Sequence, residues 1–300
     1  MTAPRTPAPA PTRTVTLTSA PSLLPLMARG ALLSPLKRPR PDAPLPGTRL
    51  VLPGLRVSQS HLAAYERVCA FPTGRDELPV TYPHLLGFPA AMRLMSERAF
   101  PLPLLGLVHT SIDITQRQSL SPAEVYELGV QVTELRAHRR GTEAVVSTEL
   151  RTGDTRVWQS TSTYLARHKT PGSAGQNPPA PEPGAAEPLP PLTEWTLGGD
   201  LGRRYAAASG DRNPIHLHPL TARLFGFPRA IAHGMWTAAR CLAQFGASGP
   251  VHVHAQFKAP VLLPGTVTYA ARGTAFELRA TKGDRVHLTG DVREVAPLAD

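Results

Sequence analysis

The residues best suited to chemistry lie between Tyr205 and Trp236. Asp211 and His216 are five residues apart in this stretch, and Pro214 between them disfavours a helical conformation at the preceding residue. We therefore expect a turn that brings the carboxylate and the imidazole to one place. Such a pair can hold a water molecule and exchange its protons, as the addition or removal of water by general acid–base catalysis requires.

A second feature follows at Gly234, at the expected start of an apolar helix over residues 234–245. The first N–H groups of a helix have no partner within the helix, and the helix dipole favours negative charge there. The Gly234 N–H could therefore hold a thioester oxygen that gains charge as an enolate forms. We interpret the neighbouring His233 as a packed, hydrogen-bonded histidine and leave it out of the site.

Two histidine pairs, His216-x-His218 and His252-x-His254, raise the question of a metal. In a strand, residues two apart face the same way. No cysteine or carboxylate accompanies either pair at the spacing of zinc ligands, so we predict no metal and no other cofactor. We interpret Cys241 as a buried, inert thiol, because it lies within the expected apolar helix.

Composition limits the classes of function. The chain has 300 residues, 41% of them hydrophobic, which suffices for two domains of ordinary size. It carries a net charge of +10, but its arginines are scattered and not interleaved with aromatic residues, so we predict no nucleic-acid partner. No apolar run approaches the roughly 20 residues that span a bilayer, and two cysteines without a disulfide pattern indicate a cytoplasmic protein. The positive charge is attributed to a solvated surface, with attraction of a phosphorylated substrate or an acidic carrier protein as the alternative.

The elements that must position these residues form two similar series. Residues 1–20 are predicted to be disordered and residues 169–191 to form a Pro-rich linker, which leaves units at 21–168 and 192–300. Each unit is expected to contain a strand, a short helix, a loop, a longer apolar helix and about four strands. The expected helices cover residues 59–69, 85–98 and 234–245, and a loop and helix are expected over residues 198–208. The expected strands cover residues 48–52, 106–115, 125–135, 143–151, 155–165, 192–197, 251–257, 266–273, 275–281 and 285–294.

Short sequences that recur in both units indicate an internal duplication. Gly87-Phe88-Pro89 corresponds to Gly226-Phe227-Pro228 at an offset of about 140 residues, and Tyr65 corresponds to Tyr205 at a similar offset. The first unit has no counterpart of Asp211 and His216. We therefore expect one active site per chain, in the second unit.

The second unit resembles the MaoC-like (R)-specific enoyl-CoA hydratases and 3-hydroxyacyl dehydratases. The resemblance rests on Ser209-Gly210-Asp211-x-Asn213-Pro214-Ile215-His216, preceded by Tyr205, and on Ala232-His233-Gly234-Met235. It implies an α+β fold with two hot-dog units in one chain (a double hot dog), each an antiparallel sheet wrapped round a central helix.

The same resemblance implies roles for the residues. Asp211 and His216 would be the catalytic dyad, Gly234 would supply the oxyanion N–H, and Ser209 and Asn213 would support the loop and its water. The chain departs from the family pattern at His218, where an acidic or amide residue is common, and at Thr266, where Asp is usual. Arg229 and Lys258 are candidate contacts for coenzyme A phosphates, with solvated surface cations as the alternative.

The implied reaction is (R)-specific hydration of trans-2-enoyl thioesters or the reverse dehydration, with coenzyme A or acyl carrier protein as the carrier. The first unit would widen the acyl tunnel. A hot-dog thioesterase is one alternative, although thioesterases commonly set the carboxylate on the central helix. A non-catalytic acyl-thioester-binding subunit is another. Because two units already form a pseudo-dimer, we expect a monomer or a homodimer.

Overall fold

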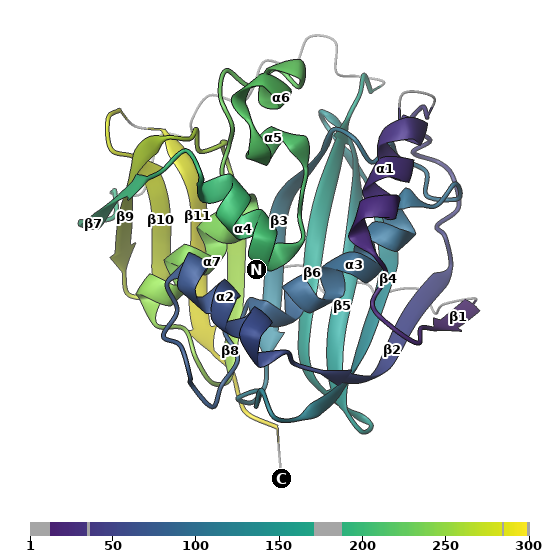
Figure 1. Cartoon of the computed structure of the whole chain (residues 1–300), viewed down its shortest axis with the longest axis horizontal. Helices are drawn as coiled ribbons and strands as arrows, with labels where there is room; N and C mark the ends of the chain where they lie inside the picture. Colours follow the sequence, from purple (N-terminus) through teal and green to yellow (C-terminus); the bar gives the residue numbers. More distant parts are fainter. Residues whose placement is uncertain (1–12, 35–36, 171–187, 284, 299–300) are drawn as a thin grey trace.

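The computed structural model describes residues 13–34, 37–170, 188–283 and 285–298. Within these residues, helices lie on one face of a single curved sheet of eleven strands (Figure 1). The strand order is β1-β2-β4-β5-β6-β3-β8-β11-β10-β9-β7. Apart from the parallel pair of β1 and β2, all neighbouring strands in this sheet are antiparallel.

The first unit wraps part of this sheet around one apolar helix. Its strands are β2 (Thr48–Arg56), β3 (Leu107–Gln116), β4 (Val125–His138), β5 (Gly141–Thr152) and β6 (Thr155–Arg167), and its helices are α1 (Leu23–Leu33), α2 (Gln59–Cys69) and α3 (Tyr82–Ser96). Ser58 caps α2 by accepting a hydrogen bond from the His61 N–H, as expected for serine at this position. The α3 helix is buried along most of its length and packs against β4 and β5.

The second unit repeats this arrangement. Its strands are β7 (Pro191–Leu197), β8 (Val251–Phe257), β9 (Gly265–Arg272), β10 (Ala275–Ala280) and β11 (Val286–Glu294), and its helices are α4 (Leu201–Ser209), α5 (Pro214–Leu217), α6 (Pro219–Leu224) and α7 (Gly234–Phe245). The α7 helix ends at Gly246, whose φ of 80° is in the left-handed region that glycine adopts without strain. Its buried face packs against β10.

The two units meet edge to edge at β3 and β8. From this junction the strands run β3-β6-β5-β4-β2 in one direction and β8-β11-β10-β9-β7 in the other, so the same order recurs about a pseudo-twofold axis. Asp113 pairs with His254 at the junction. The predicted α+β double hot dog is confirmed, and the duplication is visible in its strand order.

Further contacts join the units in addition to the β3–β8 pairing. The indole N–H of Trp236 on α7 donates to the Val68 carbonyl of α2 at 2.8 Å, and the pair is buried. The carboxylate of Glu77 accepts from the Gly249 N–H at 2.7 Å and from the side-chain amide of Gln116 at 3.1 Å. Because the units share one sheet and these contacts, they form one folded body.

The structure corrects several expectations. Residues 13–20 were predicted to be disordered, but Arg13–Thr16 form β1, parallel to β2, and Leu17 is buried. The Pro191 residue, assigned to the linker, begins β7. Residues 1–12 of the expected disordered segment and 171–187 of the expected linker lie outside the described residues.

The sequence correspondence within the duplication was also partly wrong. Gly87-Phe88-Pro89 lies inside α3, whereas Gly226-Phe227-Pro228 lies in the loop between α6 and α7. The two tripeptides therefore occupy different places in their units, although the strand order of the two units is the same. Separately, none of the helices in the described parts of the chain is both long and apolar enough to cross a membrane.

Candidate active site

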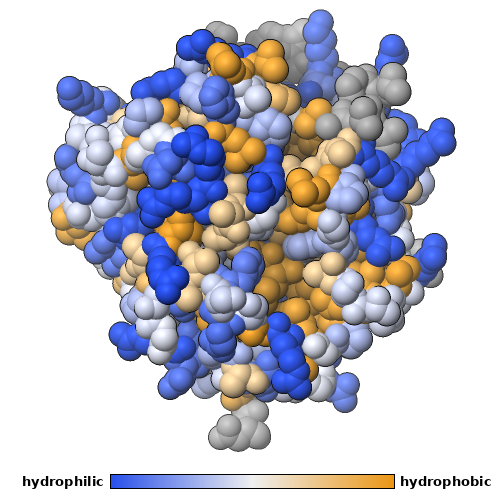
Figure 2. Space-filling view, in the orientation of Figure 1, coloured by the Kyte–Doolittle hydropathy of each residue, from blue (hydrophilic) through white to orange (hydrophobic). Residues whose placement is uncertain are grey.

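A cavity of about 1250 Å³ lies between the two units and is lined from both. Asp211, His216, His233 and Gly234 line it from the second unit, while α1, α3, β3 and β6 line it from the first. Leu24 of α1 and Leu224 of α6 are exposed, and Figure 2 shows hydrophobic surface on the face that carries the helices. The cavity is therefore built by the whole double unit.

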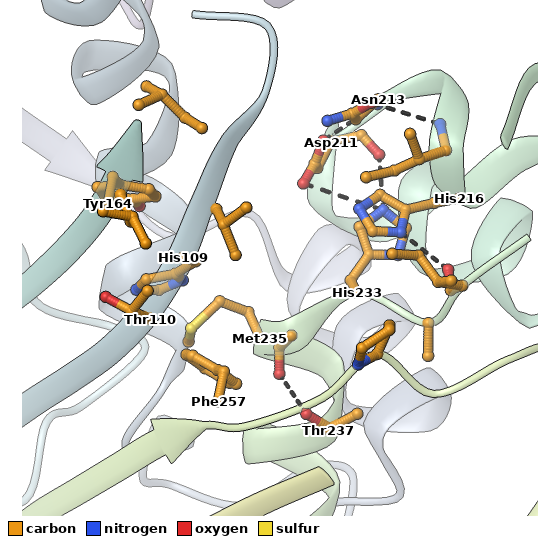
Figure 3. Close-up of a pocket in the computed structure, with 18 of the residues that line it drawn as sticks. His109, Thr110, Tyr164, Asp211, Asn213, His216, His233, Met235, Thr237 and Phe257 are labelled. Carbon is orange, nitrogen blue, oxygen red and sulfur yellow. Dashed lines mark hydrogen bonds and ion pairs between the residues drawn. The ribbon is translucent and has the colours of Figure 1, made fainter. Parts of the chain in front are cut away.

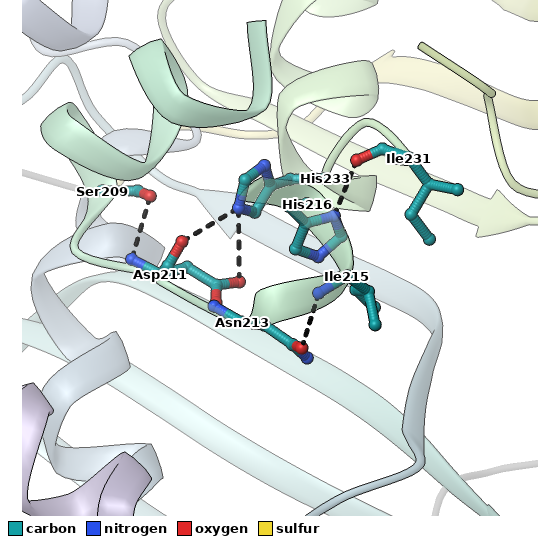
Figure 4. A network of polar contacts seen from close by, with 7 residues as sticks. All are labelled: Ser209, Asp211, Asn213, Ile215, His216, Ile231 and His233. Carbon is teal, nitrogen blue, oxygen red and sulfur yellow. Dashed lines mark hydrogen bonds and ion pairs between the residues drawn. The ribbon is translucent and has the colours of Figure 1, made fainter. Parts of the chain in front are cut away.

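Asp211 is held by a tight loop after α4 (Figure 4). Its N–H donates to Ser209 Oγ at 3.1 Å, and its Oδ1 accepts from the Asn213 N–H at 3.1 Å. Asn213 in turn caps α5, because its Oδ1 accepts from the Ile215 N–H. The other carboxylate oxygen, Oδ2, lies 4.0 Å from His233 Nε2, and the Asp211 side chain is 27% exposed.

His216 lies on α5 with its ring buried. Its Nδ1 is 2.8 Å from the Ile231 carbonyl oxygen. A carbonyl can only accept, so Nδ1 carries the proton and Nε2 of the neutral ring has a free lone pair. Burial lowers the pKa of His216, opposed by the nearby Asp211 carboxylate and the bond to Ile231. The ring is therefore neutral near pH 7, as a proton acceptor must be.

Asp211 and His216 are close enough to share one water. Their potential ligand atoms, and that of His233, all lie within 4.8 Å of one another. A water that makes two hydrogen bonds of about 2.8 Å at a near-tetrahedral angle spans about this separation. The expected turn is thus present, and it brings the predicted dyad together at the cavity wall.

His233, which the sequence interpretation left out of the site, lies against both members of the dyad. Its ring stacks on His216 with centroids 3.7 Å apart, and its Nε2 donates to the Asp211 main-chain oxygen at 3.0 Å. Burial, followed by the neighbouring His216, lowers the pKa of His233 to about 3. The ring is packed and hydrogen-bonded as expected, but its partner is the loop that carries Asp211. The sequence signal that could have included His233 in the site is its position directly before Gly234.

Gly234 begins α7 and lines the cavity. A Cβ at this position would come within 3.2 Å of the Phe257 ring, so a side chain would crowd the cavity wall. The space at Gly202 in α4 is tighter still, because a Cβ added there would lie 1.9 Å from the His216 carbonyl oxygen. Glycine at position 202 allows α5, and with it His216, to approach α4.

The remaining predicted site residues divide into two groups. Ser209 and Asn213 support the Asp211 loop, as the hydrogen bonds above describe. Lys258 lines the cavity and contacts the side-chain oxygen of Gln256. Arg229 does not line the cavity; it donates to the Pro264 carbonyl oxygen at 2.9 Å and is exposed. The predicted contact of Arg229 with coenzyme A phosphates stays a prediction; here the side chain joins its own loop to the loop of Pro264.

Among the described residues, Asp211, His216 and His233 are the group of three whose atoms lie close enough to hold a metal ion. The sequence-based expectation of no metal stays a prediction. His252 and His254 do have a carboxylate beside them, contrary to the sequence interpretation: Asp113 of β3 lies 2.9 Å from His254 Nδ1 and 3.9 Å from His252 Nε2. It comes from a strand 140 positions away, which is why spacing could not find it.

Comparison with known proteins places this geometry in a family. Residues 188–292 match the family model described as MaoC like domain. The chain is 36% identical over 261 residues to 3-hydroxyacyl-thioester dehydratase X of Mycobacterium tuberculosis, an alignment that covers 85% of this chain and 92% of that protein. The chain belongs to the MaoC-like dehydratase family.

Solved structures agree with this assignment. The crystal structure of HtdX from Mycobacterium tuberculosis superposes with a TM-score of 0.72 at 36% identity, and covers 82% of this chain and 99% of that one. A MaoC-like dehydratase from Phytophthora capsici superposes with a TM-score of 0.64 at 16% identity, and covers 85% and 96%. The second likeness supports the fold alone.

Proposed function

We propose that this member of the MaoC-like family catalyses the (R)-specific dehydration of 3-hydroxyacyl thioesters and the reverse hydration of trans-2-enoyl thioesters. Membership of the family makes the chain a hydro-lyase. The observation that carries the finer proposal is that ligand atoms of Asp211 and His216 lie within 4.8 Å of each other at the cavity wall, while Nδ1 of His216 is held by the Ile231 carbonyl. The Gly234 N–H beside it completes the set of groups that the reaction needs.

In the hydration direction, Asp211 Oδ2 and His216 Nε2 hold the water. His216 Nε2 accepts one water proton as the oxygen attacks C3 of the enoyl group. The electron pair of the C2=C3 bond then moves toward the carbonyl, and the Gly234 N–H stabilises the enolate oxygen. Return of the proton to C2 completes the addition of one water and leaves the dyad unchanged.

Dehydration runs through the same groups in reverse. The dyad removes the C2 proton, the enolate forms at Gly234, and the C3 hydroxyl leaves with a proton as water. Because water and proton are both handled by one dyad, they are exchanged on a single face of the acyl chain, which supports a product of one chirality. The resemblance to (R)-specific hydratases assigns that chirality as R.

The cavity also supports an acyl thioester as substrate. Apolar residues of α3 line its interior, and cations lie around the same cavity, namely Arg136, Arg139, Arg140, Arg167, Arg212, Lys258 and Arg285. Apolar walls suit an acyl chain, and cations suit the phosphates of coenzyme A or an acidic carrier protein.

The test is hydration of crotonyl-CoA by the wild type and by the Asp211→Asn and His216→Gln variants. Each variant removes one half of the water site while keeping its shape, so we expect kcat/KM to fall by at least about 100-fold. His218→Gln is the matched control, because His218 caps α6 outside the cavity. Chiral analysis of the product tests R specificity, and unchanged rates in both dyad variants would refute the proposal. Release of free thiol would instead identify a thioesterase.

A further inference from the structure

A second polar cluster lies in the cavity, supplied entirely by the first unit. His84 of α3, His109 of β3 and Tyr164 of β6 line the cavity together. The His109 ring stacks on Tyr164 with centroids 4.5 Å apart and on His84 with centroids 5.8 Å apart, at interplanar angles of 18° and 17°. We call these three side chains the His84–His109–Tyr164 cluster.

The cluster lies across the cavity from the dyad. Figure 3 shows His109 and Tyr164 on one side, Asp211 and His216 on the other, and Met235 and Phe257 between them. Phe257 approaches both sides: its ring is 4.8 Å from the His109 ring, and it borders Gly234. A thioester held at Gly234 would therefore extend past Phe257 toward the cluster.

Beyond the cluster the cavity continues along an apolar stripe of α3. Leu85, Phe88, Met92 and Met95 line it, at helical spacings that place them on one side of the helix. The twelve residues from His84 to Met95 cover about 16 Å along the axis. The cluster thus places polar side chains next to the apolar part of the cavity that α3 lines.

Two nitrogens of the cluster are buried without a partner. His84 Nδ1 and His109 Nε2 are shielded from solvent and have no hydrogen bond to any described residue. Leaving a buried polar atom unpaired costs about 1–3 kcal/mol, so such atoms are uncommon in folded proteins. Packing of the stacked rings does not require these nitrogens, because a phenylalanine or leucine would fill apolar space without that cost.

Charge limits which group these nitrogens can receive. Burial lowers the pKa of His84 to about 4 and also lowers that of His109, so both rings are neutral near pH 7. A neutral imidazole offers one donor and one acceptor, and in an apolar setting it does not compensate a full charge. An uncharged group that accepts or donates a hydrogen bond fits, whereas a carboxylate or an ammonium does not.

We propose that the His84–His109–Tyr164 cluster binds a hydroxyl or keto substituent on the acyl chain, on a carbon beyond C3. This inference rests on the proposed function, because it assumes an acyl thioester in the cavity. It makes the first unit a specificity determinant that selects chains with a second oxygen function. The unit then acts through particular side chains as well as through the width of the tunnel.

The experiment compares matched enoyl-CoA substrates that differ only in the chain. One series is unsubstituted from C8 to C12, and the other carries a single hydroxyl or keto group at each position from C5 outward. One hydrogen bond between neutral groups corresponds to about fivefold in kcat/KM. We expect a preference of at least this size for the oxygenated chain at one or two adjacent positions, and none elsewhere.

Two variants assign the preference to the cluster. His84→Leu and His109→Phe remove the unpaired nitrogens while filling similar space, and each should reduce the ratio of oxygenated to plain kcat/KM to near one. His61→Leu is the matched control, because His61 bonds to the Tyr82 hydroxyl outside the cavity and should retain the wild-type ratio. Thermal denaturation of each variant excludes unfolding as the cause.

Binding separates this inference from the proposed reaction. Acyl-pantetheine thioethers, which cannot turn over, are titrated by calorimetry with and without the substituent. A difference in Kd that disappears in His84→Leu supports the cluster even if no hydration is seen, in which case only the proposed function fails. Equal Kd values and equal rates at every position would overturn the inference, because bound water or simple packing would then account for the cluster.

Discussion

At the scale of single residues, His233 couples the two parts of the site. Its Nε2–H holds the Asp211 loop, its ring supports His216, and its own backbone leads directly into Gly234. A displacement of one of these groups by about 1 Å can cost about 100-fold in rate. We therefore infer that His233 is a positioning residue, which acts through Asp211 and His216 without touching the reacting atoms.

Replacing His233 with Phe tests this role. The phenyl ring retains stacking on His216 and the tilted contact with Tyr205, but it removes the donor to the Asp211 carbonyl. We expect kcat to fall by about 10- to 100-fold with a smaller change in KM, because the loop rather than the acyl pocket is disturbed.

His233→Gln serves as the conservative partner variant, since its amide can donate to the same carbonyl. It should recover part of the lost kcat. Equal kcat values for the wild type and His233→Phe, measured with crotonyl-CoA, would show that the hydrogen bond to the loop has no positioning role.

At the scale of elements, the packing of α4 against α5 sets the position of His216. Gly202 makes this packing possible, since a Cβ there would lie 1.9 Å from the His216 carbonyl oxygen and 2.9 Å from its carbon. These are backbone atoms, which cannot rotate away as a flexible side chain could. The α5 helix would have to shift to accommodate any other residue.

The Gly202→Ala variant should therefore lose both stability and activity. In an open helix the change would stabilise by up to about 1 kcal/mol, whereas overpacking here costs about 1–3 kcal/mol. We expect a lower free energy of unfolding in urea and a fall in kcat/KM of about tenfold or more as His216 moves. Gly199→Ala is the control, because its nearest neighbour would be the Pro264 ring at an ordinary 3.7 Å. If position 202 tolerates alanine as well as position 199 does, the close approach is unimportant.

Local signals explain which elements could be predicted. The ends of α2 and α7 follow from Ser58 and Gly246, which act within one turn of the helix, and β8 follows from its alternating apolar residues. The Asp211–His216 turn is local too, because Pro214 fixes the chain between the two side chains. The helix ends and the proximity of Asp211 to His216 could thus be predicted from residues that are neighbours in the sequence.

Contacts between distant segments account for what the sequence could not predict. The β1 strand exists because β2 pairs with it, although its own residues are typical of a disordered segment. The Asp113–His254 contact depends on the register of β3 with β8, and the His84–His109 stack depends on how α3 lies on the sheet. No spacing along the chain encodes these distances.

At the scale of the whole molecule, neutral histidines that are buried, or half-buried in the case of His109, couple its stability to pH. His84 and His109 in the first unit and His216, His233 and His287 in the second all have a pKa lowered chiefly by burial, to about 4 for His84 and about 3 for His233. Because unfolding restores each pKa to about 6.5, the unfolded chain binds more protons than the folded chain below that pH. Their combined contribution to stability is therefore complete above pH 6.5 and declines as the pH falls.

The partly exposed His254 acts in the opposite sense. Its hydrogen bond to Asp113, followed by the charge of that carboxylate, raises its pKa, so its contribution is complete below pH 6.5 and is lost at higher pH. Below pH 6.5 the contribution of His254 is therefore nearly constant. The change in stability in that range then reflects the buried rings.

We predict that the free energy of unfolding in urea falls steadily between pH 6.5 and about pH 4. Because the units share one sheet and the Trp236–Val68 bond, tryptophan fluorescence and far-UV circular dichroism should report a single transition at each pH. His84→Leu removes one of the titrating rings, so its stability should depend less steeply on pH than that of the wild type. A stability independent of pH over this range, or the same slope in His84→Leu, would mean that these rings are hydrated and titrate normally in the folded protein. Two separate transitions would mean that the units unfold independently despite their common sheet.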